Sequence, residues 1–398
     1  MAGLGPRARR CLWALLVGGL VVRLVMAFAT YGVRFDVDAF LLVHNALHAD
    51  PLHVYGVERW PYPPGYFPWI VISSKLQILT GVPLTDWVQV PAILADIAIA
   101  WIVQSVLGRR GHPSAERLLA CGLVALGPIF VMISGFHGQI DSVAILPALL
   151  AVLVWERYRG PRRGLYAGLL IGVGGLIKTV PLVAVLALLP SARSRREGVT
   201  ALAAALVPVA LSFVPFAVVD FAHVQEALRY RGVPGVGGIS LLVQPELANF
   251  WISNAPFAVP NGASSLLSDA GGAITAVALG AAIVFLFRRR PEPVVGIALL
   301  YMVVWAFGVN FFLQYLVWGI PFLLMAGYVR EVAAAQLLIL PAVVLAYGRP
   351  WSLGLAPGLF VVVSLGLWAS AAAGLVILGR APYVRAPGPR AAPSVHAG

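Results

Sequence analysis

The stretch that decides the fold class is CLWALLVGGLVVRLVMAFAT, residues 11–30. A helix needs about 20 apolar residues to cross the hydrocarbon core of a bilayer, and similar stretches follow almost to the end of the chain. Of the 398 residues, 60% are apolar and 11% are charged, whereas about 25% are charged in soluble domains. Mean hydropathy is +0.89. The sequence therefore predicts an all-α polytopic membrane protein, because no polar block is long enough for a soluble domain.

The net charge of +12 comes from arginines in short clusters between the apolar stretches. Membrane proteins concentrate Lys and Arg in cytoplasmic loops, so the clusters indicate topology and contact with anionic lipids rather than nucleic-acid binding. They are Arg7/Arg9/Arg10, Arg109/Arg110/Arg117, Arg157/Arg159/Arg162/Arg163, Arg193/Arg195/Arg196, Arg288/Arg289/Arg290, Arg330 and Arg380/Arg385/Arg390. The first cluster precedes an apolar run longer than that of a signal peptide, which favours an uncleaved signal anchor.

Placing every cluster on the cytoplasmic side predicts about twelve helices with both termini inside. Ten full crossings are expected at about 11–30, 86–107, 117–134, 140–155, 199–219, 268–287, 294–310, 315–329, 332–348 and 353–378. Residues 164–190 have arginines at both ends, so we expect a bent hairpin there, broken near Lys178-Thr-Val-Pro181. One multi-pass domain is expected over residues 1–379, followed by a Pro/Ala/Arg-rich cytoplasmic tail over 380–398.

The polar residues gather on the other side of this predicted topology. Ten of the sixteen acidic residues and five of the seven histidines fall at the outer face, mainly in extracytoplasmic loops at about 31–85 and 220–267. Acidic residues hardly influence orientation, so this enrichment favours a polar cavity open to the outer face. A merely solvated outer surface is the alternative. The bias of 26 Arg against 2 Lys indicates a GC-rich bacterial genome and hence the plasma membrane.

The first outer loop opens with RFDVDAF, residues 34–40. Its carboxylates, Asp36 and Asp38, stand at the mouth of a membrane bundle, where such groups can perform acid–base chemistry. An apolar helical pattern begins at Phe40, and His44 and His48 follow it four residues apart. Two histidines at that spacing can bind a metal, but spacing supplies no third ligand, so no metal site is predicted.

The second half of this loop begins with the turn at Tyr62-Pro-Pro-Gly65. The apolar stretch that follows, residues 66–79, is short for a crossing and favours a helix that lies at the membrane interface. The predicted aromatic anchors of the interface are Trp60, Tyr62, Tyr66 and Trp69.

Five motifs resemble, in the same order, those of the GT-C glycosyltransferases that use polyprenyl-phosphate sugars. Asp36-x-x-x-Phe40 follows the first crossing, and a Tyr-Pro-Pro turn comes about 25 residues later. GFHGQID, residues 135–141, resembles the Gly-Gln-x-Asp segment of this class. Leu-Ile-Lys178 with Pro181, and QYLVW at 314–318 with Pro321, are similar to segments of the bacterial mannosyltransferase branch. The resemblance implies a GT-C-like bundle with a helical first extracytoplasmic loop. In relatives with an Asp-Glu pair the two acids are adjacent, whereas here Val37 separates two aspartates.

The resemblance implies that Asp36 is the general base, because it stands four residues before the aromatic residue. Glycosyl transfer needs a base for the proton of the acceptor hydroxyl and positive charge for the departing phosphate. Asp38 is the alternative base, or a partner that raises the pKa of the first carboxyl by like-charge repulsion. A plain loop aspartate paired with Arg34 is the structural alternative.

The expected phosphate-binding residues are Lys178, Arg229, Arg231 and His137. A lysine at the break of the hairpin is costly unless it is functional, although it could instead extend to the interface. The arginines precede a glycine-rich loop whose amides could hold phosphate; a plain flexible loop is equally consistent. The expected sugar- or acceptor-binding residues are Gln139, Asp141, Tyr62, Gln314 and Tyr315. Asp141 could instead cap the following helix. Asp96 lies in the middle of a crossing, a costly position unless it is paired.

Taken with the resemblance, these residues predict a membrane glycosyltransferase. It would move a hexose, mannose in the branch it resembles, from a polyprenyl-phosphate donor to a lipid or glycan acceptor at the outer face, with inversion. Neither a metal nor another cofactor is expected. The alternative is a transporter or flippase, since about twelve helices also describe many carriers. Carriers, however, usually show two related halves and ionisable residues near the midplane, whereas here the halves do not repeat visibly and the polar residues gather at one face.

Overall fold

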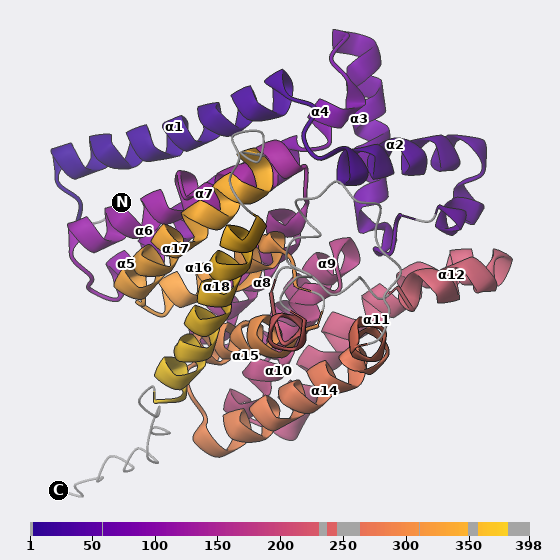
Figure 1. Cartoon of the computed structure of the whole chain (residues 1–398). Helices are drawn as coiled ribbons and strands as arrows, with labels where there is room; N and C mark the ends of the chain where they lie inside the picture. Colours follow the sequence, from indigo (N-terminus) through magenta and orange to yellow (C-terminus); the bar gives the residue numbers. More distant parts are fainter. Residues whose placement is uncertain are drawn as a thin grey trace, which may run out of the picture.

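The computed structural model describes residues 3–57, 59–230, 237–244, 263–309, 311–348 and 357–380. Within these ranges every regular element is helical, so the predicted polytopic all-α fold is confirmed (Figure 1). Arg231 and the tail beyond residue 380 lie outside them.

Seven helical segments in the described ranges are long and apolar enough to cross a membrane, and four further apolar segments are shorter. Together with α8 (Asp141–Arg157) they correspond one to one to the twelve predicted helices. The long ones are α1 (Pro6–Ala29), α4–α5 (Leu84–Trp87, Val90–Arg109), α6–α7–η3 (Ser114–Ala125, Pro128–Met132, Ile133–His137), α11 (Arg195–Val219), α14 (Ala263–Arg289), α17 (Val329–Gly348) and α18 (Pro357–Gly379). The shorter ones are α9 (Arg163–Ile177), α10 (Val183–Leu188) with its flanking turns, α15 (Pro293–Phe307) and η7–α16 (Leu313–Tyr315, Leu316–Met325).

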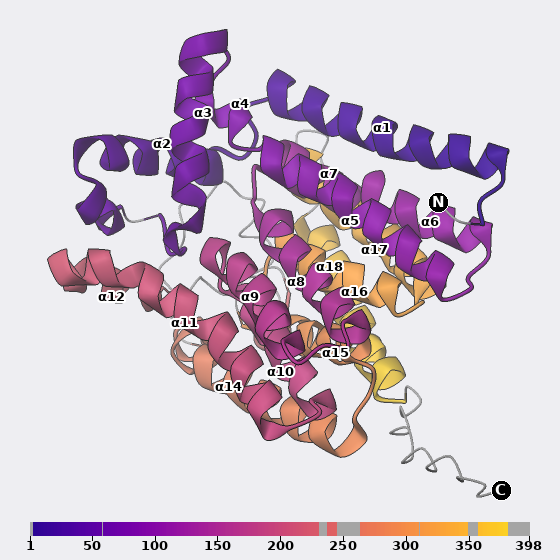
Figure 2. The ribbon, with the colours of Figure 1, turned by 180° about the vertical axis from the view of Figure 1, so that it is seen from behind.

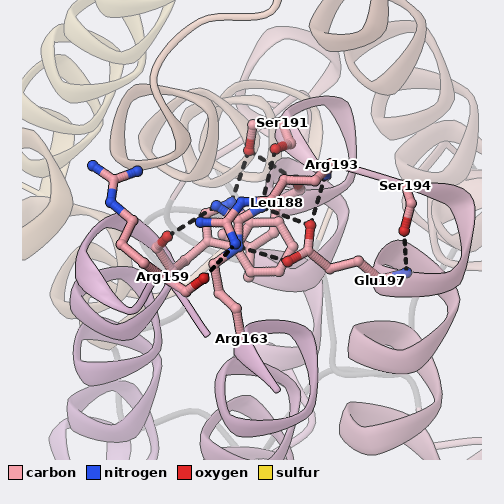
Figure 3. Close-up of polar contacts among 8 residues, drawn as sticks. Arg159, Arg163, Leu188, Ser191, Arg193, Ser194 and Glu197 are labelled. Carbon is pink, nitrogen blue, oxygen red and sulfur yellow. Dashed lines mark hydrogen bonds and ion pairs between the residues drawn. The ribbon is translucent and has the colours of Figure 1, made fainter. Parts of the chain in front are cut away.

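The hairpin predicted over residues 164–190 is confirmed. α9 ends at Lys178, whose backbone is extended, and the chain then returns through η4 (Val180–Leu182), α10 and η5 (Leu189–Ser191). Figure 3 shows the polar contacts at the end of the hairpin opposite the bend, where its first residues meet its last residues and the start of α11. The Arg163 guanidinium donates two hydrogen bonds of 2.7 Å to Glu197 on α11 and contacts the Ser191 carbonyl oxygen at 3.4 Å. Lys178 therefore lies at the opposite end of the hairpin from these groups.

The first loop folds into α2 (Arg34–Ala49), η1 (Pro51–Gly56), η2 (Pro64–Tyr66) and α3 (Phe67–Thr80). With α12 (Phe221–Leu228) these helices project from one side of the bundle in both views (Figures 1 and 2). α2 begins at Arg34 and not at Phe40, so both aspartates are helical. The prediction of Trp60 and Tyr66 as interface anchors is wrong, because both rings are buried against Phe40 and form the core of the loop.

An ion pair lies inside the bundle, between α1 and α5. Arg23 Nε is 3.0 Å from Asp96 Oδ2, and both side chains are fully buried. Arg23 also donates to Ser134 Oγ at 3.1 Å and to the backbone carbonyl of Val124 at 2.8 Å, near the end of α6. Asp96 therefore has the partner that its position requires. That partner, Arg23, was overlooked because it stands within the first apolar run.

Candidate active site

A cavity of about 860 Å³ lies beside the bend of the hairpin. Its walls come from the start of α2, the 61–62 turn, residues 178–180, α12, α14, α15 and the start of α16. The polar and aromatic side chains that line it include Asp36, Tyr62, Lys178, Tyr230, Gln314, Tyr315 and Trp318. The fold therefore brings together Asp36, Tyr62, Lys178, Gln314 and Tyr315, five of the residues expected in the site.

Glycines let the start of α2 lie against the loop before α8. Gly32 and Gly138 both have positive φ, 76° and 82°. A Cβ on Gly32 would stand 2.2 Å from the Phe136 carbonyl oxygen, and one on Gly138 would stand 2.8 Å from Val37. This close approach places Asp36 beside His137.

Asp36 is held by a chain of hydrogen bonds. Its Oδ2 is 2.6 Å from His137 Nε2, and His137 Nδ1 is 2.8 Å from the Tyr347 hydroxyl on α17. His137 is fully buried on the π-helical turn η3, whereas the Asp36 side chain is 24% exposed. His137 therefore stands behind Asp36 and does not line the cavity, which differs from its expected place at a phosphate.

Asp38 points elsewhere. Its Oδ1 accepts a hydrogen bond of 2.7 Å from the Tyr31 hydroxyl, and it does not line the cavity. The same bond raises the pKa of the Tyr31 phenol. The Arg34 guanidinium lies 5.6 Å from the centre of the Tyr31 ring, and Asp36 pairs with His137 instead.

Lys178 is 4% exposed and lies in a network of polar groups. Its Nζ donates to Gln139 Oε1 at 2.9 Å and to Asp141 Oδ2 at 2.8 Å. Trp318 Nε1 donates to the other oxygen of Asp141 at 2.5 Å. The expected helix cap by Asp141 is not formed, since no side chain caps α8. Gln139 and Asp141 contact the lysine and are not lining residues of the cavity.

The turn at residues 61–65 covers the Lys178 side chain on one side of the cavity. Lys178 Nζ lies 4.7 Å from the centre of the Tyr62 ring. Gly65 makes this possible, because a Cβ there would stand 2.4 Å from the Leu176 carbonyl oxygen at the end of α9. Burial is the main cause that raises the pKa of the Tyr62 phenol well above its usual range, and nearby Asp36 adds to it. Tyr62 therefore remains a neutral hydrogen-bond donor.

The wall formed by η7 and the start of α16 offers an acceptor group and an aromatic face. Gln314 is 8% exposed, and its Oε1 makes no hydrogen bond within the described part of the chain. Tyr315 stacks on Trp318 with 4.0 Å between the ring centres. An unpaired amide oxygen beside stacked aromatic rings suits a polyhydroxylated ligand.

The remaining candidates lie outside this cavity. Arg229 lines a neighbouring pocket. His44 and His48 stack on each other with 6.3 Å between ring centres. Among the described residues, no group of three or more His, Cys, Asp or Glu side chains could hold a metal ion. Trp318 and Tyr347 complete the networks around Lys178 and Asp36. No signal in the sequence connects Tyr347 with a histidine 210 residues earlier.

The comparison with known families decides the class of protein. The model of glycosyltransferase family 87 matches residues 60–310, more than half of the chain. The chain belongs to glycosyltransferase family 87. This is a family of polytopic GT-C-type membrane glycosyltransferases, so the GT-C resemblance is confirmed and the transporter alternative is not retained. No curated protein matches the chain. As a family 87 member, the protein acts on a sugar donor and an acceptor, and it contacts membrane lipids.

Proposed function

We propose that this glycosyltransferase moves a hexose, mannose in the branch it resembles, from a polyprenyl-phosphate donor to a lipid or glycan acceptor at the outer face of a bacterial plasma membrane. The observation that supports the proposal is the presence of a carboxylate, Asp36, and a cation, Lys178, in the wall of one cavity. The catalytic domain would span residues 1–379, with both termini in the cytoplasm.

The chemistry needs one base and one cation. The acceptor hydroxyl oxygen attacks the anomeric carbon from the face opposite the phosphate and inverts its configuration. Asp36 takes the hydroxyl proton while the bond between that carbon and the phosphate oxygen breaks. The lipid phosphate leaves with the bonding electrons, and its negative charge faces Lys178. A lysine has three N–H donors, and two of them are used by Gln139 and Asp141.

The lipid part of the donor fits the wall made by α14 and α15. Gly271, Gly272, Thr275, Ala276 and Leu279 of α14 line the same cavity as Lys178. Small and apolar side chains leave room for a prenyl chain between the polar site and the surrounding lipid. In this arrangement the phosphate lies near the lysine and the prenyl chain follows α14.

The other site residues receive roles from their positions. Tyr62, Gln314 and Tyr315 would contact the sugar in the cavity. Gln139 and Asp141 would orient the lysine, and His137 would orient the base. Asp38, Arg229 and Arg231 stay outside the proposed reaction centre, since the first two do not line the cavity and Arg231 lies outside the described ranges.

The base is tested with purified protein, radiolabelled polyprenyl-phosphate sugars and a membrane extract that contains acceptors. Asp36→Asn should keep donor binding but lower transfer by about 10²–10⁴-fold, the usual cost of losing a general base. Asp38→Asn is the matched control, because it removes an equal charge two residues away and off the cavity. A folded Asp36→Asn protein that transfers sugar at the wild-type rate would exclude the mechanism.

The phosphate-binding role of Lys178 is tested with a double substitution. Replacing the lysine alone would leave Asp141 buried without its cation, which is costly in itself. The Lys178→Gln/Asp141→Asn variant removes both charges and keeps similar shapes. It should weaken donor binding by about tenfold or more, since a hydrogen bond to a charged group contributes roughly 1.5–3 kcal/mol. Lys75→Gln on exposed α3 is the control. Unchanged donor affinity in the paired variant would contradict the phosphate role.

A further inference from the structure

A second polar cavity of about 510 Å³ lies between the first loop and α12. One wall comes from η1 and the residues after it, and the other comes from α12 and the residues that follow. On the α12 side the cavity is lined by His223, Gln225, Glu226, Arg229 and Tyr230. No residue of this set has a role in the proposed reaction.

The second cavity adjoins the candidate active site. Pro61, Ala227 and Tyr230 line both cavities. A ligand in the second cavity therefore lies against the same residues as a sugar beside Lys178 and Asp36. An extended molecule could place one end in each.

The lining chemistry suits a carbohydrate. Sugars are recognised by aromatic faces together with planar groups that bind neighbouring hydroxyls, and here the exposed ring of Tyr230 combines with the amide of Gln225. The cavity also offers one carboxylate, Glu226, and one guanidinium, Arg229, three residues apart on one helical turn. Opposite charges in equal number favour a neutral polyhydroxylated ligand over a phosphate.

The wall of this cavity is held firmly in place. Asp220 accepts a hydrogen bond from the backbone N–H of His223 at the start of α12, and His223 Nδ1 lies 2.6 Å from the Asp220 carboxylate. Val224 is buried in the same apolar cluster as Trp60 and Tyr55. The two walls therefore share a core, and the cavity is a built feature of the outer loops.

We propose that the cavity between η1 and α12 is a subsite for the carbohydrate part of the acceptor. The acceptor is then a glycan or a glycolipid with a sugar head group, and not a plain lipid alcohol. The inference rests on the proposed function, which it makes more specific. The terminal sugar of the acceptor would present its hydroxyl to Asp36 while the preceding sugar occupies the second cavity.

Binding is tested first, because it does not depend on turnover. Saturation-transfer NMR with mannobiose, cellobiose and methyl arabinofuranoside, on full-length protein in nanodiscs without donor, should show binding of at least one sugar. The Glu226→Gln/Arg229→Gln variant should lose that signal, whereas Lys75→Gln and Asp36→Asn should keep it. Binding by none of the three sugars, retention in the double variant, or displacement of the bound sugar by inorganic phosphate would overturn the proposal.

Transfer is tested second, with radiolabelled polyprenyl-phosphate mannose and the sugar that binds. The double variant should raise the acceptor KM by about tenfold or more and leave the donor KM and the slow hydrolysis of the donor unchanged. An equal rise with farnesol as the acceptor, or a change confined to the donor KM, would contradict a sugar subsite. If wild-type protein binds the sugar but neither transfers nor hydrolyses any polyprenyl-phosphate donor, the proposed function fails while the subsite stands.

Discussion

At the scale of single residues, the geometry around Asp36 explains how one carboxylate can act as a positioned base. An ionised carboxylate only accepts hydrogen bonds, so the contact with Asp36 places a proton on His137 Nε2, and Nδ1 can then accept from the Tyr347 hydroxyl. His137 then donates to Oδ2 of Asp36 and leaves the other carboxylate oxygen for the acceptor proton. The orientation of the base is therefore set by a buried histidine, which is held in turn by a tyrosine hydroxyl.

Tyr347→Phe tests this chain of hydrogen bonds. Without the hydroxyl, Nδ1 loses its partner and the proton can move to it, so Nε2 no longer donates to Asp36. We expect kcat to fall by about tenfold, the worth of one ordinary hydrogen bond, with the donor KM unchanged. Kinetics and ¹⁵N chemical shifts of His137 measure the effect. An unchanged kcat with the Nε2–H tautomer retained would show that the tyrosine has no positioning role.

The buried ion pair between Arg23 and Asp96 leads to a prediction about stability. Removing one partner of such a pair typically costs about 3–5 kcal/mol. Arg23→Ala should therefore lower the thermal stability in detergent sharply, because the buried Asp96 carboxylate loses its cation and the carbonyl of Val124 loses the guanidinium donor. Asp96→Asn should cost less, since an amide still accepts from Ser134, which donates to Asp96 at 2.6 Å. Equal melting temperatures for wild type and Arg23→Ala would contradict the importance of the pair.

At the scale of elements, the hairpin depends on glycines that face α11. A Cβ on Gly164 would stand 2.5 Å from the Glu197 carbonyl oxygen, and one on Gly168 would stand 2.3 Å from that of Ala201. Small residues at a spacing of four let helix backbones approach closely in a membrane. This approach holds α9 in place and therefore fixes the position of Lys178 at its end.

Gly168→Ala should separate α9 from α11, because the added methyl group meets backbone and not a movable side chain. Overpacking of this kind costs about 1–3 kcal/mol, and donor binding should weaken because Lys178 moves with α9. Gly280→Ala on α14 is the matched control, since nothing lies within 4 Å of its added Cβ. Thermal unfolding and donor affinity measure both variants. An equal stability of the two would exclude close packing as the reason for the glycine.

The elements also show what the sequence could predict about the site. Asp36 and Lys178 could be found because a carboxylate and a lysine are conspicuous in so apolar a chain. The choice of Asp36 over Asp38 as the base rests on the family resemblance, because the direction in which each side chain points depends on where α2 starts. Residues two apart on a helix point about 200° apart, so one faces the cavity and the other faces Tyr31. Arg23 and Tyr347 were missed because their partners are distant in the chain.

At the scale of the whole molecule, arginines of the clusters that are predicted to face the cytoplasm lie at one end of the bundle. Arg110 lies 3.3 Å from Glu156 at the end of α8 and 3.1 Å from Glu292 at the start of α15. The groups around Arg163 close the open end of the hairpin (Figure 3). Lys178 lies at the other end of the hairpin, 4.7 Å from the Tyr62 ring of the first loop. The helices of that loop project from the bundle (Figures 1 and 2). The arrangement separates a basic end from the end that carries the cavity.

This separation predicts which positions an impermeant thiol reagent can reach in intact cells. Cys11 is exposed and Cys121 is buried, so both are first replaced by alanine. A cysteine at Gly56, beside the second cavity, should be labelled from outside. Cysteines at Ser194 and Arg289 should be labelled only after the membrane is opened, because arginine-rich loops remain in the cytoplasm. Labelling of Ser194 and Arg289 from opposite sides would contradict the return of the hairpin to its starting side. If Ser194 and Arg289 were labelled from outside and Gly56 only after the membrane is opened, the cavity would face the cytoplasm. A donor at the outer face could not reach it there.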